Sequence, residues 1–560
     1  MNRFLKENII LFALAIGLIW VSHYYFFRID LTSDKRYSIS KSTKQLMKNV
    51  TEPMEITVYL TGDLNPGFLR LKKATAEMIH ELSMYANTPP NIHYQNPSEA
   101  ESDERRKENY LEMERRGMVA TSIYEKDKEG KIIQKIVYPW IKISYRGKTL
   151  SVNILKNLRG LSGEENLNAS VENLEFTMID AIRRLVNTQI AKIAFIEGHG
   201  ELDEIYTYDI SKTLSKYFQI DRGIIENDIS VLDSYRAIII AKPLTAFSEK
   251  DKFVIDQYIM RGGRVLWLVD GVRISQESFS TQGRSPAIGL DLNLSDMFFK
   301  YGVRINPVLL EDVQSVHVPV NVASGGEQPH FESMPWTLAP LLLTSNEHAI
   351  TRNIPQVKAS FCSMIDMVGD MKNLQKTLLI ATSTNTHILQ TPVDVSLSDI
   401  RDLKDNNYFS KAYVPVGVVL EGVFLSNFEN RMPPPDIVNP PTIKRESEPT
   451  RQIFVACGNI IKNDVERQSD SIRALPLGFD RFMNQQFGNN ELIANAVLYL
   501  TDRDGWMNLR NRTTKWRLLN QKVVVAERAK WQTVNIVLPL LLLIMAGFAY
   551  QILRKRKYAR

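Results

Sequence analysis

A short glycine-rich segment with acidic and histidine side chains has the residue types and spacing best suited to chemistry. It follows the apolar residues 190–196 and reads Glu197-Gly198-His199-Gly200-Glu201. The two glycines permit tight backbone geometry, and the histidine and glutamate can bind a metal, a sugar or a peptide. In the alternative interpretation, the glycines shape a turn and the polar groups cap the next helix or bridge two domains. All five residues are therefore predicted to be binding or domain-contact residues.

Familiar catalytic and cofactor motifs do not match this sequence. The spacing around His199 is not the His-Glu-x-x-His of zinc enzymes, and no Gly-Lys-Ser/Thr ending marks a phosphate loop. Gly-x-Ser-x-Gly, the nucleophile elbow, is absent. Cys457 has no histidine nearby in the sequence and is interpreted as a small buried thiol. We therefore predict no catalytic residue, no metal, no other cofactor and no enzymatic activity.

Composition sets further limits. Hydrophobic residues make up 44% of the chain and charged residues 24%, as in ordinary folded proteins, and the net charge is +6. Much of that charge lies in residues 554–560, so the composition does not predict binding to nucleic acid. Cys362 and Cys457 are the only cysteines, which excludes a cysteine zinc site and leaves open whether the two form a disulfide.

The elements around the glycine-rich segment indicate a doubly wound α/β domain. Residues 190–196 have the composition of a buried strand. A helix is expected after Asp203, which is a plausible N-cap, with Ile210, Leu214, Tyr217 and Phe218 on one face. Because ligand sites of such sheets lie beyond the carboxyl ends of the strands, we expect the glycine-rich segment at that edge.

Later segments extend this pattern into a mainly parallel sheet. Strands are expected at 236–241, 264–270, 303–310, 377–382, 415–420 and 453–459, and helices at 248–260, 294–301 and 489–500. The region before the glycine-rich segment is expected to be a thioredoxin-like α/β domain. Its elements are strands at 54–60 and 91–95, helices at 68–85, 99–116 and 173–187, and a hairpin of 131–145 with 148–154. It lacks Cys-x-x-Cys, so redox chemistry is not predicted.

Both ends of the chain carry long apolar segments. Residues 9–27 and 534–553 each approach the roughly 20 residues that a membrane helix requires. Arg3 and Lys6 precede the first segment, and basic residues 554–557 follow the second. Because positive flanks stay in the cytoplasm, we expect both termini there, contact with membrane lipid, and the main body across the membrane.

Several stretches resemble the gliding-motility-associated ABC transporter auxiliary ("substrate-binding") proteins of the GldG type from Bacteroidota. They are residues 30–40, 193–202, 247–259, 262–268, 476–479 and 487–490. The resemblance implies a Rossmann-like, amidotransferase-like central domain. It also implies a GldF-type permease and a GldA-type ATPase as partners, in the bacterial inner membrane. An envelope or periplasmic partner would complete this arrangement, and the family offers no catalytic residue to carry over.

Together these observations predict one domain organisation and two functions. The expected parts are 1–8 cytoplasmic, 9–27 transmembrane, 28–187 thioredoxin-like, 188–510 Rossmann-like, 511–533 helical linker, 534–553 transmembrane, and 554–560 cytoplasmic. The first function is a non-catalytic subunit that couples the transporter to a substrate or an envelope partner. The alternative is a periplasmic glycan- or peptide-binding domain, with or without hydrolytic activity, that uses a cleft at Gly198–Glu201.

Overall fold

The structure, a computed structural model, consists of two compact units. One comprises residues 1–37 with 513–560, and the other residues 38–512. The described residues are 12, 17, 38–126, 131–158, 161–187, 189–226, 228–321, 323, 328, 330–369, 372–396, 405, 407–437, 442–468, 471–511 and 526–558. The predicted first membrane helix, 9–27, thus lies outside the described residues except for Phe12 and Gly17, which are helical.

The first unit, residues 1–37 with 513–560, contains the long helix α13 (Arg528–Tyr558), which includes Pro539. An 18-residue window within its stretch Arg528–Arg556 has a mean hydropathy of 2.3, and no part of that window is buried. Among the described residues this is the one helix long and apolar enough to cross a membrane. The predicted span at 534–553 is confirmed as such a helix, whereas most of the predicted linker, at 512–525, lies outside the described residues.

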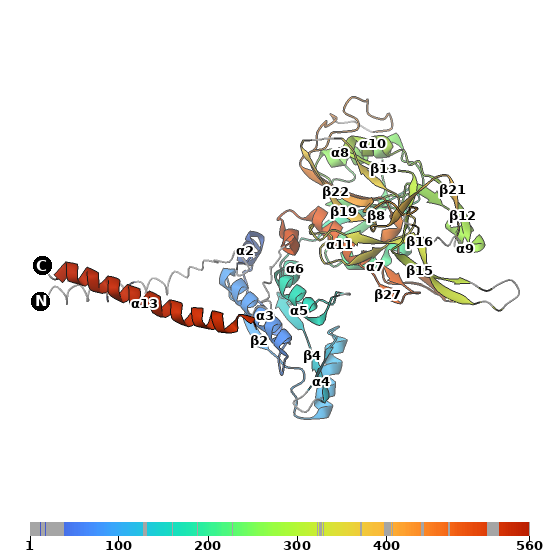
Figure 1. Ribbon diagram of the computed structural model, residues 1–560. Helices are drawn as coiled ribbons and strands as arrows, with labels where there is room; N and C mark the ends of the chain where they lie inside the picture. The colour runs from blue at the N-terminus through green and yellow to red at the C-terminus, as the bar shows by residue number, and fades with distance from the viewer. Residues whose placement is uncertain are drawn as a thin grey trace. The chain divides into compact units, whose positions relative to one another are not determined.

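The largest sheet described in the larger unit has ten strands, of which β8, β15, β16, β19 and β22 are labelled in Figure 1. Its strands, in spatial order, are β15 (Ser315–Asn321), β16 (Phe331–Thr344), β19 (Leu374–Ala381), β22 (Pro415–Gly422), β23 (Thr450–Val455), β10 (Val265–Leu268), β9 (Ala237–Ala241), β7 (Ala191–Glu197) and β8 (Phe218–Ile224). The tenth strand, β17 (Gln356–Lys358), pairs with β16.

The expectation of a mainly parallel sheet is wrong. Four pairings, from β23 through β10, β9 and β7 to β8, are parallel. Five pairings, among β15, β16, β17, β19, β22 and β23, are antiparallel. The physical reason is the connection type: β7, β9 and β10 are joined by crossovers, which parallel neighbours require, whereas β22 runs back along β23. The molecule is therefore a mixed α/β structure with several sheets.

Both faces of the parallel strands are buried, which explains their nearly continuous apolar sequences. In β9, Ile238 and Ile240 pack in one core cluster, and Ile239 packs in the other. The first cluster includes the helices α8 (Glu249–Met260) and α10 (Ser295–Tyr301). The second includes α7 (Tyr208–Leu214) and α11 (Asn489–Thr501), and Figure 1 shows these two helix pairs at separate places around the strands.

The helix after β7 is shorter than predicted. A 3-10 turn, η1 (Glu204–Thr207), precedes α7, and Asp203 makes no side-chain capping bond to it. Ile210 and Leu214 are buried as expected, but Phe218 opens strand β8. The spacing of Tyr217 and Phe218 fits a helical face. Residues 218–224 also alternate between apolar and polar side chains, as in an edge strand, and their pairing with β7 makes them a strand.

The front region, residues 38–187, has its own four-stranded sheet. Its order is β2 (Asn91–Tyr94), β1 (Glu55–Val58), β5 (Trp140–Tyr145) and β6 (Lys148–Asn153). Its helices are α2 (Lys41–Lys48), α3 (Pro66–Tyr85), α4 (Asp103–Arg115), α5 (Gly163–Glu172) and α6 (Leu174–Val186). The hairpin around Arg146-Gly147 is confirmed, but its first half is two strands: β4 (Ile132–Val137) pairs with β3 (Thr121–Lys126) instead.

Among the described residues, five smaller sheets are formed by strands within 272–486. They are β11 (Val272–Ile274) with β12 (Arg284–Gly289) and β21 (Val393–Ser396), β13 (Val303–Ile305) with β18 (Ile365–Met367), β14 (Val308–Asp312) with β20 (Thr386–Gln390), β24 (Val465–Gln468) with β25 (Ser471–Ala474), and β26 (Phe479–Asp480) with β27 (Gln485–Gln486). The short helices are α9 (Gln276–Gln282), η2 (Gly458–Ile461) and η3 (Trp506–Asn511). The predicted strand 303–310 is thus divided between two of these sheets.

Candidate functional site

The glycine-rich segment lies at the carboxyl end of β7, at the edge where it was expected. Gly198 and Gly200 have φ angles of +111° and +72°, which L side chains rarely adopt. A Cβ on Gly200 would lie 3.2 Å from Leu244 Cβ. The carbonyl oxygen of His199 accepts hydrogen bonds from the amides of Leu244 and Thr245, at 2.8 and 2.9 Å. The segment is therefore pinned to the chain that leaves β9.

The His199 side chain lies between two carboxylates. Its Nδ1 is 3.1 Å from Glu201 Oε1, and its Nε2 is 3.2 Å from Asp251 Oδ2. A carboxylate only accepts, so both ring nitrogens can donate only if the imidazole is protonated. The ring is buried and stacks on Phe247 with a centroid distance of 3.7 Å. His199 is therefore a buried cation between two anions.

The pKa values agree with this charge assignment. Burial opposes protonation of His199, but its hydrogen bonds to Asp251 and Glu201 outweigh that cost and raise its pKa to about 9. For Asp251, burial opposes the charged form, and the bonds to His199 and Ser248 nevertheless lower its pKa. Ser248 also caps α8 by accepting from the Asp251 amide at 3.1 Å. One ionic cluster thus joins the end of β7 to the start of α8.

Glu197, the remaining acid of the segment, is also bound within the chain. Arg222 Nε donates to Glu197 Oε1 at 2.6 Å. The same guanidinium donates to Thr207 Oγ1 at 3.0 Å and to the Leu202 carbonyl at 2.7 Å. The structure therefore brings the predicted residues together. Glu197 and His199 contact neighbouring elements through Arg222 and Asp251, and Glu201 contacts His199 within the segment.

The rest of the carboxyl edge is closed in the same way. Lys242 Nζ lies 2.9 Å from Asp270 Oδ2 and donates to Asn459 Oδ1 at 2.7 Å. Cys362 and Cys457 are both free and buried, and the first thiol donates a hydrogen bond to the second. Burial raises the pKa of Cys362 well above its usual range, which keeps this thiol protonated. Within the described ranges, no cluster of three or more His, Cys, Asp or Glu side chains is arranged to hold a metal ion.

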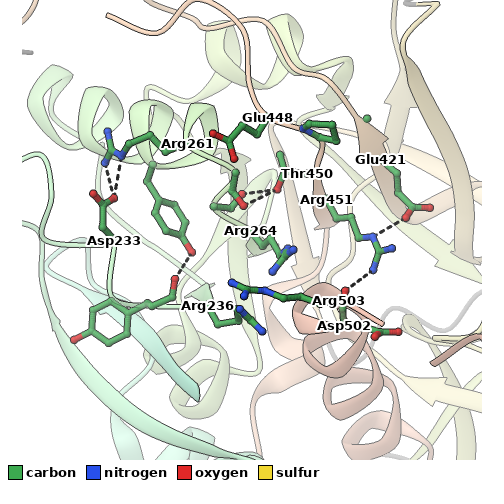
Figure 2. Close-up of a pocket in the computed structure, with 16 residues that line it drawn as sticks. Asp233, Arg236, Arg261, Arg264, Glu421, Glu448, Thr450, Arg451, Asp502 and Arg503 are labelled. Carbon is green, nitrogen blue, oxygen red and sulfur yellow. Dashed lines mark hydrogen bonds and ion pairs between the residues drawn. The ribbon is translucent and has the colours of Figure 1, made fainter. Parts of the chain in front are cut away.

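A pocket of about 800 Å³ opens at the opposite, amino-terminal edge of the parallel strands (Figure 2). Three neighbouring strands reach it at their first residues, and each carries an arginine there: Arg236 before β9, Arg264 before β10 and Arg451 in β23. The strand register aligns Val265 with Gln452, so Arg264 and Arg451 are neighbours. Arg261 and Arg503 complete a set of five arginines, which we call the arginine pocket.

Two of the five arginines have fixed partners. Arg261 Nη2 lies 2.7 Å from Asp233 Oδ1. Arg451 Nε lies 2.9 Å from Glu421 Oε1, and its Nη1 donates to the Tyr499 carbonyl at 2.8 Å. In each pair the carboxylate neutralises the charge of the guanidinium, which weakens its attraction for an anionic ligand. Their role is to shape the wall of the pocket.

The other three, Arg236, Arg264 and Arg503, face the centre of the pocket, and Figure 2 shows no interaction from them to the residues drawn. No carboxylate of the described chain forms an ion pair with any of the three. The Nε atoms of Arg236 and Arg264 are buried without a hydrogen-bond partner among the described residues. Burial, followed by the charge of Arg451, lowers the pKa of Arg264. The arrangement is a concentration of positive charge with unused donors.

Sequence reasoning missed the arginine pocket. A signal was present, because an arginine stands at the start of each of the segments 236–241, 264–270 and 450–455. What the sequence does not show is that β23 lies beside β10, although almost 200 residues separate them. Without that strand order, the three arginines read as isolated surface charges.

Comparisons with known proteins identify the family. A family described as an "ABC-type uncharacterized transport system", of ABC transport auxiliary proteins, matches residues 191–496, and a domain of unknown function matches residues 33–144. An uncharacterized protein of Borreliella burgdorferi is 22% identical over 544 residues, with 95% of this chain and 94% of that protein covered.

Among solved structures, the N-terminal domain of mmIFT52 is similar, with 13% identity over 56% of this chain and 98% of that one. The TM-score is 0.31, which establishes no common fold. The family match, in contrast, runs from β7 to α11 and covers more than half of the chain, including the main sheet and the arginine pocket up to Arg451. The chain therefore belongs to the family of uncharacterized ABC-type transport auxiliary proteins.

Proposed function

We propose that this protein is a non-catalytic auxiliary subunit of an ABC transporter, anchored in the membrane by α13. The observation that carries the proposal is the family match over residues 191–496, which coincides with the main sheet. The absence of a phosphate-loop motif from the sequence supports an ATPase on a separate chain. The partners would be a permease and an ATPase of the GldF and GldA types, and gliding motility the process served.

The finer organisation is part of the same proposal. The front region, 28–187, would be a thioredoxin-like domain and residues 188–510 a Rossmann-like one, both on the periplasmic side of a bacterial inner membrane. A second membrane helix at 9–27 would hold the body at two points. The basic residues on both flanks support cytoplasmic termini. The main body would then transmit permease motion to a substrate or an envelope partner.

Within this proposal, Glu197, Gly198, His199, Gly200 and Glu201 hold together elements of one domain, the main domain, and do not bind a ligand. Their charged groups are already satisfied by Arg222 and Asp251 and by each other. A ligand at that edge would have to displace buried ion pairs, which is costly. Gly198 and Gly200 are needed because the backbone has a positive φ angle at both positions. His199 is protonated and donates from both ring nitrogens, so it has no free lone pair with which to act as a general base.

Co-purification tests the proposal. The full chain, tagged at its C-terminus and extracted in mild detergent, is expected to retain an ABC permease and its ATPase, identified by mass spectrometry. The control is a variant in which residues 534–553 are replaced by an unrelated membrane span of equal length. Retention of both subunits by the natural chain and their loss from the control would support coupling through the helix. Their absence from both preparations would contradict the proposed function.

A further inference from the structure

The arginine pocket has an unusual charge distribution for a cavity with no bound partner. The guanidinium groups of Arg236, Arg264 and Arg503 lie together, and no carboxylate of the described residues forms an ion pair with them (Figure 2). Like charges repel, and buried donors without acceptors cost stability. A fold that keeps this arrangement implies that something else supplies negative charge and acceptor atoms there. We propose that the arginine pocket binds the phosphate group of a phosphorylated ligand.

The acids that line the pocket do not fill this role, because each is engaged elsewhere. Asp233 and Glu421 bind Arg261 and Arg451. Asp502 accepts hydrogen bonds from three backbone amides, those of Asp504, Gly505 and Met507. Glu448 lies 2.9 Å from Lys444. The charge of Asp502 acts on Arg264 from a distance and partly offsets the lowering of its pKa, but no carboxylate of the described chain forms an ion pair with the three arginines. An anion is therefore the ligand that the pocket favours.

The type and number of donors favour phosphate over carboxylate. A guanidinium presents five N–H donors in a rigid plane that matches two oxygens of a phosphate. A tetrahedral phosphate carries up to two charges and can accept from several guanidiniums at once, whereas one carboxylate is saturated by fewer. The three strands place their arginines on one wall, and Arg503 approaches from the segment after α11. Such convergent guanidiniums are typical of phosphate recognition.

The size of the pocket indicates that the phosphate belongs to a larger molecule. A volume of about 800 Å³ lies within the range of small-molecule sites, which is roughly 300–1,000 Å³. Tyr235 and Tyr258 line the side near α8, and Tyr258 Oη donates to the Tyr235 carbonyl at 3.1 Å. The pocket volume is larger than a phosphate group occupies, so it can also hold the group that is esterified to the phosphate. The ligand is therefore a phosphate ester, either a soluble one or the headgroup of a lipid.

Isothermal titration of the full chain in detergent micelles tests the proposal. Pyrophosphate is the primary probe, citrate is the carboxylate control, and the ionic strength is held constant. We expect saturable binding of pyrophosphate, and binding about tenfold weaker or more after Arg264→Gln or Arg503→Gln, since each removes a charge-assisted contact. The matched control is Arg105→Gln on the exposed surface of α4, which should not change the binding.

Arg264→Lys separates a binding defect from a folding defect. This variant keeps the charge and loses the planar fork, so it should bind pyrophosphate more weakly than the natural chain and more tightly than Arg264→Gln. Circular dichroism should give all variants the same folded spectrum. Glycerol 3-phosphate represents a soluble phosphate ester, and soluble dihexanoyl phosphatidic acid represents a lipid headgroup. The compound that binds more tightly identifies which of the two classes the pocket prefers.

Three results would overturn the proposal: no saturable binding of any phosphate, citrate binding as tightly as pyrophosphate, or binding unchanged in both glutamine variants. The proposal does not depend on the transporter partners, because the titration uses this chain alone. A failed co-purification with successful titration would reject the proposed function and keep the phosphate site. The reverse pair of results would reject the phosphate site and keep the transporter role.

Discussion

The two edges of the parallel strands differ in how their charges are arranged. At the carboxyl edge, His199, Glu201, Asp251, Lys242 and Asp270 are all bound to one another or to backbone groups within the chain. At the amino edge, three of five arginines have no anionic partner in the described chain, and a pocket of about 800 Å³ lies between them. We call the carboxyl edge closed because its charged groups are paired within the chain. We call the amino edge open because three of its arginines have no anionic partner among the described residues.

This difference shows that position in an α/β sheet is a weaker guide to function than charge balance. Open sheets usually bind ligands at their carboxyl edge. Here the polar residues at that edge neutralise one another, which favours stability and leaves nothing for a ligand. At the opposite edge, unneutralised charge lowers the stability of the unliganded protein, as functional sites commonly do. Substitutions at the carboxyl edge and at the amino edge should therefore have different effects on stability and on ligand binding.

The largest effect is expected from His199→Leu. It leaves Glu201 without its cation and Asp251 with only Lys250, whose Nζ lies 3.4 Å from Asp251 Oδ1. Breaking a buried ion pair costs about 3–5 kcal/mol. The matched control is His93→Leu, because His93 also lies 2.9 Å from a glutamate, Glu55, but on the surface. Loss of a surface pair costs at most about 1 kcal/mol. Chemical denaturation measures both, and equal losses would contradict a closed carboxyl edge.

The pH dependence of stability should follow His199. Its pKa rises from 6.5 to about 9 on folding, so its stabilising effect is complete below pH 6.5 and is lost as the pH rises through 9. The loss should be on the order of 3 kcal/mol between these limits. Because the pKa of Asp251 is lowered, its own contribution is lost instead as the solution becomes acidic.

His199→Gln provides the measurement. The free energy of unfolding of the natural chain should fall between pH 6.5 and 9 more steeply than that of the variant. Two parallel curves over this range would mean that His199 is neutral in the folded protein.

Arg451 and Arg264 are neighbours in the sheet and should respond with opposite signs. Arg451→Met leaves Glu421 with only the Tyr499 hydroxyl as a partner and should cost about 2 kcal/mol. Arg264→Met removes an unpaired charge and a buried donor, so it should leave stability unchanged or raise it by up to about 1 kcal/mol. Unfolding by denaturant without added phosphate shows the signs. A large loss in both variants would indicate that Arg264 has a structural partner.

The smallest effect is expected at the glycines. Gly147 and Gly200 have nearly equal φ angles, +73° and +72°, so alanine at either position strains the backbone by about 1 kcal/mol. Only at Gly200 does the added Cβ also meet a neighbour, Leu244 Cβ at 3.2 Å. Gly200→Ala should therefore be the more destabilising of the two in a thermal melt. Equal melting temperatures would show that the segment after β9 can move aside.

Local sequence patterns predicted the local elements well. The strands at β1, β2, β7, β9, β10, β19, β22 and β23 and the helices α3, α6, α8, α10 and α11 were expected close to their observed positions. Ser248 caps α8 as its residue type predicts. The placement of Glu197, His199 and Glu201 at the carboxyl edge also followed from a strand that ends at glycines.

What the sequence did not reveal depends on contacts between distant segments. Phe218 starts a strand rather than ending a helix because β7 offers it a partner. The antiparallel half was missed because the order of β16, β19, β22 and β23 is set by packing, not by local periodicity. His199 gained its role from Asp251, 52 residues away. The arginine pocket required the pairing of β10 with β23.

A crossed thermal-shift experiment tests the division between the two edges most directly. The melting temperature of the full chain is measured with and without saturating pyrophosphate for the natural protein, His199→Gln and Arg264→Met. We predict a lower baseline with a full pyrophosphate shift for His199→Gln, and a normal or raised baseline with little shift for Arg264→Met. The opposite pattern, in which His199→Gln abolishes the shift and Arg264→Met preserves it, would contradict an open amino edge and a closed carboxyl edge.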